Sequence, residues 1–168
     1  SEYVSNKRLV SINPDSWEHT VIFGIDIDRG ADGNPGDPGT LYTIASERLA
    51  RMNGFLFAYV SPNQGIKALF MVDRKTTQML NKPAISNGDE EAEAPSPDAI
   101  LAERILLHKA IYHHIVKLVE QETGLHPDRV CNDPARLQFL YHGTFIPAAS
   151  AASTVLVLPK LEELRYSY

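Results

Sequence analysis

The sequence contains a single cysteine, Cys131, and this scarcity excludes two kinds of structure. One thiol cannot form an intramolecular disulfide, and it cannot build a cysteine-rich zinc site. We therefore expect a cytoplasmic protein, because disulfide-poor chains are typical of reducing compartments. Cys131 has no histidine beside it in the sequence, which favours a buried, neutral thiol over a nucleophile.

The chain also lacks long apolar runs and a positive net charge. No apolar run approaches the roughly 18–20 residues of a membrane-spanning helix, so we expect no membrane partner. The formal net charge of −5 counts against extensive nonspecific binding of nucleic acid. It leaves room for a polymerase-like site, in which carboxylates gather around a metal ion and the metal reverses the local charge.

What the chain does contain is an alternation of apolar runs and turn residues, which predicts a single α+β domain over residues 1–168. The predicted strands are residues 9–12, 21–27, 55–60, 66–72, 137–141 and 154–158, with 55–60 and 66–72 forming an antiparallel hairpin. The predicted helices are residues 42–53, ending at Gly54, and residues 99–123, capped by Asp98 and Gly124.

Two segments are predicted to lie outside regular structure. Residues 29–39 contain four glycines and two prolines, which is typical of a mobile loop. Residues 82–98 are proline-rich and carry the acidic run Asp89, Glu90, Glu91 and Glu93. We interpret them as a solvated, disordered insertion.

The first candidate site is Asp26-Ile27-Asp28, at the end of an apolar strand. In a strand, residues i and i+2 point to the same face, roughly 6–7 Å apart. Two carboxylates at that separation repel each other and are costly to desolvate, and a divalent cation relieves both costs. Hard oxygen ligands favour Mg²⁺ or Mn²⁺. A solvent-exposed strand end explains the pattern equally well.

The second candidate is the turn Ser61-Pro62-Asn63-Gln64-Gly65, followed by Lys67. A tight turn of small residues lets the backbone approach a ligand closely. The Lys67 ammonium at the start of the next strand offers a point charge for a triphosphate. Taken alone, an ordinary hairpin with a solvated lysine is the better interpretation.

The third candidate is Asp133 with Arg136, just before an apolar run. Asp133 offers a third carboxylate for a metal ion, and Arg136 offers a bidentate contact to phosphate. Taken alone, a turn with an exposed ion pair is the better interpretation. Together, however, the three candidates supply the carboxylates and cations that phosphoryl transfer requires.

The order of these motifs over residues 21–142 resembles the archaeo-eukaryotic primase superfamily, the prim-pols. The resemblance is greatest to the phage, plasmid and Bacteroides branch with VirE-like N-terminal domains. Asp26 and Asp28 match the first metal-binding motif of the family, Ser61, Gly65 and Lys67 match its nucleotide-phosphate motif, Asp133 matches the third acidic position, and Arg136 matches the basic residue that follows it. Many prim-pols carry histidine where this chain has Lys67.

The resemblance implies an RRM-like catalytic core packed against a smaller α/β half. It implies a DNA-directed primase–polymerase that uses Mg²⁺ or Mn²⁺, nucleoside triphosphates and a single-stranded DNA template. Its catalytic metal ligands are then Asp26, Asp28 and Asp133, and its nucleotide-binding residues are Ser61, Gly65, Lys67 and Arg136. The resemblance also implies a replicative helicase domain as the partner, in cis or in trans, since family members are often joined to one. The helicase motif G-x-x-x-x-G-K-[ST] does not occur in this chain.

Two other interpretations stay open. The run Gly24 to Asp28 also resembles the opening strand of RNase-H-like metal-dependent nucleases, which need further acids on later strands and on a helix. The chain can also be a non-catalytic nucleotide- or DNA-binding module of a replication initiator. The histidines of the long predicted helix lack the spacing of a metal-binding helix, and we expect His108 to be packed against the core.

Overall fold

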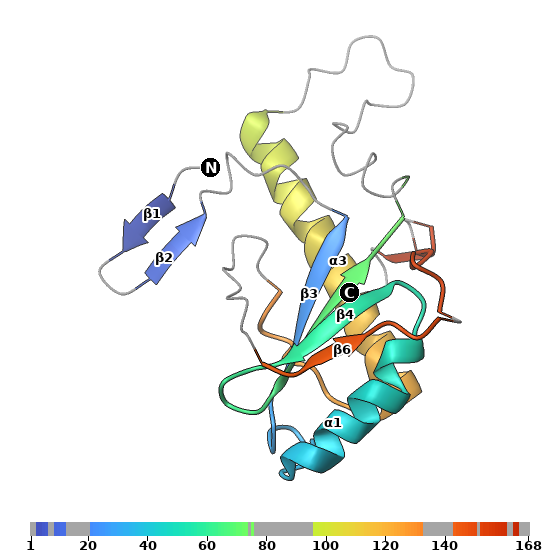
Figure 1. Cartoon of the computed structure of the whole chain (residues 1–168). Coiled ribbons are helices and arrows are strands. Elements are labelled where there is room, and N and C mark those ends of the chain that lie inside the picture. Colours follow the sequence, from blue (N-terminus) through green and yellow to red (C-terminus); the bar gives the residue numbers. More distant parts are fainter. Residues whose placement is uncertain are drawn as a thin grey trace.

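A four-stranded antiparallel sheet with helices on one face forms the main body of the protein (Figure 1). The computed structural model describes residues 3–6, 9–12, 21–73, 75, 96–132, 143–150, 152–160 and 163–164. Along the chain the elements of this body are β3 (Ile22–Ile27), α1 (Pro38–Glu47), the 3-10 helix η2 (Leu49–Arg51), β4 (Phe55–Val60), β5 (Ile66–Met71), α3 (Pro97–Thr123) and β6 (Phe145–Pro147). The predicted α+β class is confirmed.

The strands lie in the order β3-β5-β4-β6, so β3 pairs with β5 and not with its neighbour in sequence, β4. Their register places small side chains in the middle of the sheet. Ile25 lies opposite Ala68, Ala68 lies opposite Ala58, and Ala58 lies opposite Ile146. All four side chains of this row are buried, since the row faces the helices.

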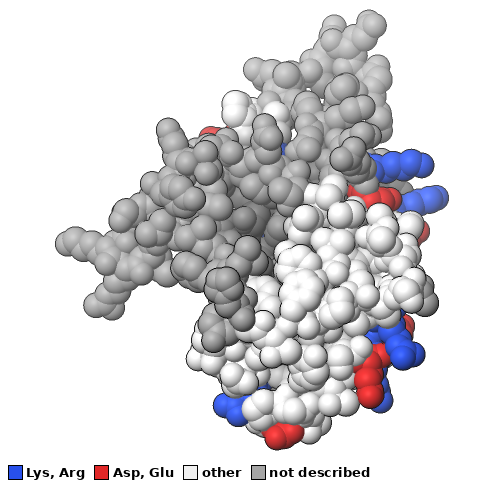
Figure 2. Space-filling model, viewed as in Figure 1, with Lys and Arg blue, Asp and Glu red and all other residues white. Residues whose placement is uncertain are grey.

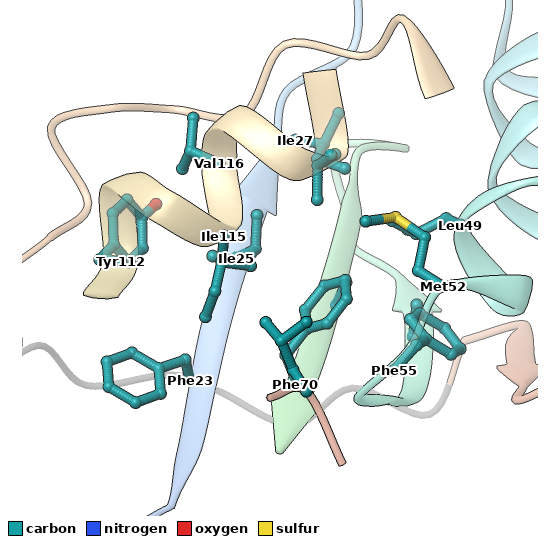
Figure 3. Close-up of a cluster of buried hydrophobic side chains, with 14 of the residues drawn as sticks. Phe23, Ile25, Ile27, Leu49, Met52, Phe55, Phe70, Tyr112, Ile115 and Val116 are labelled. Carbon is teal, nitrogen blue, oxygen red and sulfur yellow. The ribbon is translucent and has the colours of Figure 1, made fainter. Parts of the chain in front are cut away.

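The core fills the space between the sheet and the two helices (Figure 3). β3 alternates between buried and partly exposed positions, as a strand with one covered face should. Phe23, Ile25 and Ile27 point into the core, where they meet Ile115 and Val116 of α3. Gly24 and Asp26, which lie between them, therefore point to the opposite face of the sheet.

The predicted hairpin is confirmed, and the bounds of β4 are those predicted from the sequence. β5 ends one residue earlier than predicted, at Met71. Val72 instead forms a single parallel bridge with Leu156. The predicted strand over residues 154–158 is wrong, because this segment reaches the sheet only through that bridge and the backbone bonds beside it.

The prediction for the first helix is wrong at both ends. α1 begins at Pro38, inside the predicted loop, because Asp37 caps it by accepting a 2.7 Å hydrogen bond from the Thr40 amide. A proline at the first helical position also favours that start. The helix ends at Glu47 and is followed by η2 before the chain reaches Gly54.

The long helix is confirmed, but the prediction that Asp98 caps its start is wrong. Ser96 is the N-cap and accepts a hydrogen bond from the Ala99 amide, and Pro97 and Asp98 lie in the first turn. Residues 97 and 98 therefore belong to α3 and not to the predicted insertion 82–98, of which 82–95 lie outside the described residues. Gly124 ends the helix in the left-handed conformation, as predicted.

The remaining elements were predicted in part. β2 (Leu9–Ile12) is confirmed and forms a separate two-stranded sheet with β1 (Tyr3–Asn6), which was not predicted. β6 was not predicted either, and the predicted strand 137–141 lies outside the described residues. None of the described helices has the length and apolar composition needed to cross a membrane.

Candidate functional site

Asp26, Lys67 and Tyr59 lie side by side across three neighbouring strands. The register places Asp26 of β3 opposite Lys67 of β5, and Lys67 opposite Tyr59 of β4. This row lies on the face of the sheet that points away from the helices. Lys67 Nζ donates a hydrogen bond to Asp26 Oδ2 and forms an ion pair with it. Residues from two separate sequence motifs are therefore in direct contact.

Tyr59 is the member of this row that sequence reasoning missed. Its side chain is buried, and burial raises the pKa of its phenol above the ordinary value of a tyrosine. The Lys67 ammonium opposes that rise in pKa, and the Asp26 carboxylate adds to it. The signal available in the sequence was weak, because Tyr59 sits in an apolar strand that reads as core.

Asp28 lies one residue beyond the end of β3 and is exposed. It lines an open hollow of ≈ 650 Å³ together with Arg29 and three residues of the β4–β5 turn, Pro62, Asn63 and Gln64. The first and second sequence motifs thus share one concave surface at this end of the sheet.

Ser61 and Gly65 shape the turn that forms the other wall of the hollow. The Ser61 hydroxyl oxygen accepts a hydrogen bond from the Gly65 amide at 3.1 Å, and the Ser61 amide donates to the Gly65 carbonyl at 2.8 Å. A Cβ on Gly65 would come within 2.8 Å of the Ile27 carbonyl oxygen. The close approach that Gly65 permits is therefore to β3, and contact of these residues with a nucleotide stays a prediction.

Asn34 connects the loop after β3 to the segment after α3. Its side chain is buried and makes three hydrogen bonds. Nδ2 donates to the Asp28 carbonyl at 3.0 Å and to the His126 carbonyl at 2.8 Å, and Oδ1 accepts from the His126 amide at 2.8 Å. Sequence reasoning missed Asn34, because its partner lies 92 residues away.

Asp128 makes a second connection between the same two segments. Its amide donates a 2.8 Å hydrogen bond to the Asp26 carbonyl, which points away from β5. Its own carbonyl accepts from the Tyr112 hydroxyl of α3 at 2.6 Å. Its carboxylate accepts from the Cys131 thiol at 2.8 Å. Cys131 is buried, as predicted.

The histidines of α3, His108, His113 and His114, are partly buried. His108 stacks on Phe23 with ring centroids 4.7 Å apart, which confirms the predicted packing. His113 Nε2 lies 3.0 Å from the side-chain nitrogen of Asn132. Burial lowers the pKa of both His113 and His114, and nearby cationic side chains lower it further.

The donor chemistry at β3 fits a hard divalent cation. Asp26 and Asp28 offer carboxylate oxygens, and Lys67 engages only one oxygen of Asp26. Within the part of the chain that the structure describes, no group of three or more potential metal ligands gathers. Asp133 and Arg136 lie outside the described residues, which include Asn132 and continue again from residue 143.

The charged side chains of the described residues form no extended basic area on the face shown in Figure 2. In the view of Figure 2 the charged side chains of the described residues lie mainly toward the margins, and the central surface carries few of them. This distribution agrees with the net charge of −5.

Comparisons with protein-family models, with curated proteins and with solved structures found no match for this chain.

Proposed function

We propose that this protein is a primase–polymerase of the prim-pol type, which adds nucleotides from nucleoside triphosphates on a single-stranded DNA template. One observation carries the proposal. Lys67 and Asp26, 41 residues apart in the sequence, are in contact on one face of the sheet, and Asp28, two residues after Asp26, lines the open hollow beside the β4–β5 turn. An acid, a cation and an open concave surface are the parts that phosphoryl transfer requires.

The arrangement of the strands supports an RRM-like core. A β-α-β-β-α order, with the third strand between the first and the second, is typical of split βαβ folds. β3, β4 and β5 follow that order with α1 and α3 as the helices. β6 pairs with β4, while the segment containing Asp128 is bound to the outer edge of β3 through the Asp26 carbonyl.

The residues of this chain would have distinct tasks in the reaction. Asp26 and Asp28, with Asp133, would hold Mg²⁺ or Mn²⁺, which when bound neutralises charge on the triphosphate and favours ionisation of the attacking hydroxyl. The Lys67 ammonium would exchange its contact with Asp26 for one with a phosphate oxygen. Arg29, which lines the hollow, would add a second cation, with Arg136 as the predicted third.

Primer extension tests the proposal directly. A labelled primer on a single-stranded template, incubated with the protein, nucleoside triphosphates and Mn²⁺, should lengthen. Asp26→Asn should abolish lengthening, because the amide keeps the shape of the side chain and removes its charge. Asp98→Asn, an exposed acid in the first turn of α3, is the matched control and should extend normally. Undiminished extension by Asp26→Asn would refute the assignment.

The same assay separates the two alternatives. A nuclease of the RNase-H type would shorten the labelled strand, but β4 and β5 contribute no acid to this sheet. A non-catalytic module would leave the strand unchanged. It would also bind nucleotide equally with and without Mn²⁺ in calorimetry, whereas the proposed enzyme should bind nucleotide more tightly with metal.

A further inference from the structure

Two phenylalanine rings are stacked on the face of the sheet that points away from the helices. Ile146 of β6 is buried on the helix side, so its neighbours Phe145 and Pro147 point to the opposite face. Phe57 of β4 lies opposite Pro147 and shares that face. The rings of Phe57 and Phe145, called the ring pair below, have centroids 5.0 Å apart and planes at 26°. Phe145 is 55% exposed, and Phe57 is half-buried.

The ring pair lies at the end of the described strand order, on β6 and its neighbour β4 (Figure 1). A single exposed apolar side chain needs no explanation. Two stacked rings, however, form a flat apolar surface, and nucleobases stack on aromatic side chains whatever their sequence. The geometry is therefore that of a surface for flat, unsaturated ligands.

The charges on this face favour contact with bases over contact with phosphates. The four strands of the sheet carry two charged side chains, Asp26 and Lys67, and these form an ion pair. A surface that bound a nucleic acid mainly through its phosphates would need several lysines or arginines. Bases are free to stack on protein side chains where they are unpaired, which selects a single strand over a duplex.

The edge strand is poorly suited to the main rival occupant, a second copy of this chain that extends the sheet. β6 is three residues long and ends in Pro147, which has no amide hydrogen to donate. Short edge strands and prolines on an edge both oppose the addition of another strand. The ring pair therefore fits a ligand that stacks better than one that adds a strand.

The ring pair is in register with the row that contains Asp26. Phe145 lies opposite Tyr59 in the sheet. Tyr59 lies opposite Lys67, and Lys67 lies opposite Asp26. Three strand spacings of about 4.8 Å place Phe145 about 14 Å from Asp26. At about 3.4 Å per nucleotide, about four nucleotides span that separation. A strand on the ring pair can therefore reach the row.

We propose that Phe57 and Phe145 form a stacking platform for the unpaired bases of single-stranded DNA, and that the platform holds the template. The identification of the strand as the template rests on the proposed function, whereas the binding of bases does not. Loss of one stacked base typically weakens binding about 5-fold or more.

The test uses a labelled oligodeoxythymidylate about 12 nucleotides long, with binding followed by fluorescence anisotropy in the absence of metal and nucleotide. Phe145→Leu keeps an apolar side chain and removes the ring. A strand of the same length without bases keeps the phosphates and removes the stacking partners. The matched control is Leu106→Ala, which changes an apolar side chain of α3 that is 57% exposed.

A second variant, Phe145→Trp, reports on stacking in the folded protein. It keeps an aromatic ring, and its indole emission should be quenched as bases stack on it. The sequence contains one other tryptophan, Trp17, so the wild type gives the background signal. If Phe145→Leu does not fold, the quenching and the strand without bases decide the question.

We expect Phe145→Leu to bind the oligonucleotide at least about 5-fold more weakly, and the wild type to bind the strand without bases at least about 5-fold more weakly. Phe145→Trp and Leu106→Ala should bind as the wild type does. Equal affinity in Phe145→Leu and the wild type, or equal affinity for the two strands, would overturn the inference and leave the proposed function standing.

Two further results separate this inference from its rivals. A dimer of the wild type in light scattering that Phe145→Leu alone dissociates, with no change in oligonucleotide binding, would show that a second copy covers the rings and would overturn the inference. Ring-dependent binding by a wild type that extends no primer would refute the proposed function and leave the stacking platform standing.

Discussion

The contact between Lys67 and Asp26 leads to a quantitative prediction about stability. Replacing Lys67 by methionine keeps most of the apolar stem and removes the ammonium, so Asp26 loses the cation beside it. The side chains are 23% and 15% exposed, respectively. Exposed ion pairs contribute about 0.2–1 kcal/mol, and removing one partner of a fully buried pair costs about 3–5 kcal/mol. For a pair between these limits we expect Lys67→Met to lower the free energy of unfolding by about 2 kcal/mol.

A double-mutant cycle isolates the contact itself. Asp26→Asn should cost about 1 kcal/mol, because the freed Lys67 ammonium can extend toward water. The double variant should cost less than the sum of the single variants, with a coupling free energy of about 1–2 kcal/mol. Urea denaturation at pH 7, followed by circular dichroism in low and high salt, measures these values. Because most of the pair is shielded from solvent, the coupling should fall only slightly in high salt.

A coupling free energy below about 0.3 kcal/mol would contradict this reasoning, because the limit of additivity for unconnected sites lies near that value. Such a result would mean that Lys67 and Asp26 are each stabilised by other surroundings. The matched control is Lys117→Met, which removes an exposed lysine of α3 and should change the free energy of unfolding by no more than about 0.5 kcal/mol.

Three further predictions concern the rest of the fold. Gly54→Ala should lower the free energy of unfolding by more than about 3 kcal/mol, because an added Cβ would lie 2.5 Å from the nearest side-chain atom. Gly124 has the same left-handed backbone conformation but open space around it, so Gly124→Ala should cost only about 1 kcal/mol. Thermal unfolding measures both values. Ser96→Ala should lower the stability by about 1 kcal/mol, and Asp98→Ala by less, when both are compared by urea denaturation. Burial lowers the pKa of His114, so the unfolded chain binds more protons and stability should fall as the pH drops below about 6.5; His114→Gln should reduce that fall.

Much of the sheet could be predicted from the sequence because its signals are local. β4 and β5 are short apolar runs separated by a tight turn, and this pattern specifies a hairpin without reference to the rest of the chain. β6 could not be predicted in the same way. Three residues carry no periodicity, and Phe145 to Pro147 form a strand only because β4 offers a free edge.

The helix start at Pro38 shows how two local signals can compete. Four glycines in residues 29–39 indicate a loop, and the Asp37-Pro38 pair at the end of that run indicates a helix start. The capping hydrogen bond from the Thr40 amide decides between them, since it satisfies a donor at the start of the helix. Glycine content alone was the weaker guide.

The candidate site could be predicted as a set of residue types but not as a set of contacts. Asp26 and Lys67 were singled out in separate motifs, and nothing local indicates that β3 pairs with β5 and not with β4. The hydrogen bonds between Asn34 and His126 could not be predicted at all, because a single asparagine in a loop carries no pattern that indicates a partner 92 residues away. Contacts of this kind follow from the tertiary fold.

The core nevertheless decides the contact between Asp26 and Lys67. Side chains in a strand alternate between two faces, so a slip of one residue between β3 and β5 would turn Asp26 into the core and expose its apolar neighbours. The buried residues Ile25 and Ile27 oppose that slip, since each would lose a fully covered position beneath α3. The observed register keeps both residues buried and places Asp26 opposite Lys67 on the other face. The hydrophobic pattern of β3 therefore fixes the face of the sheet on which its one charged side chain lies.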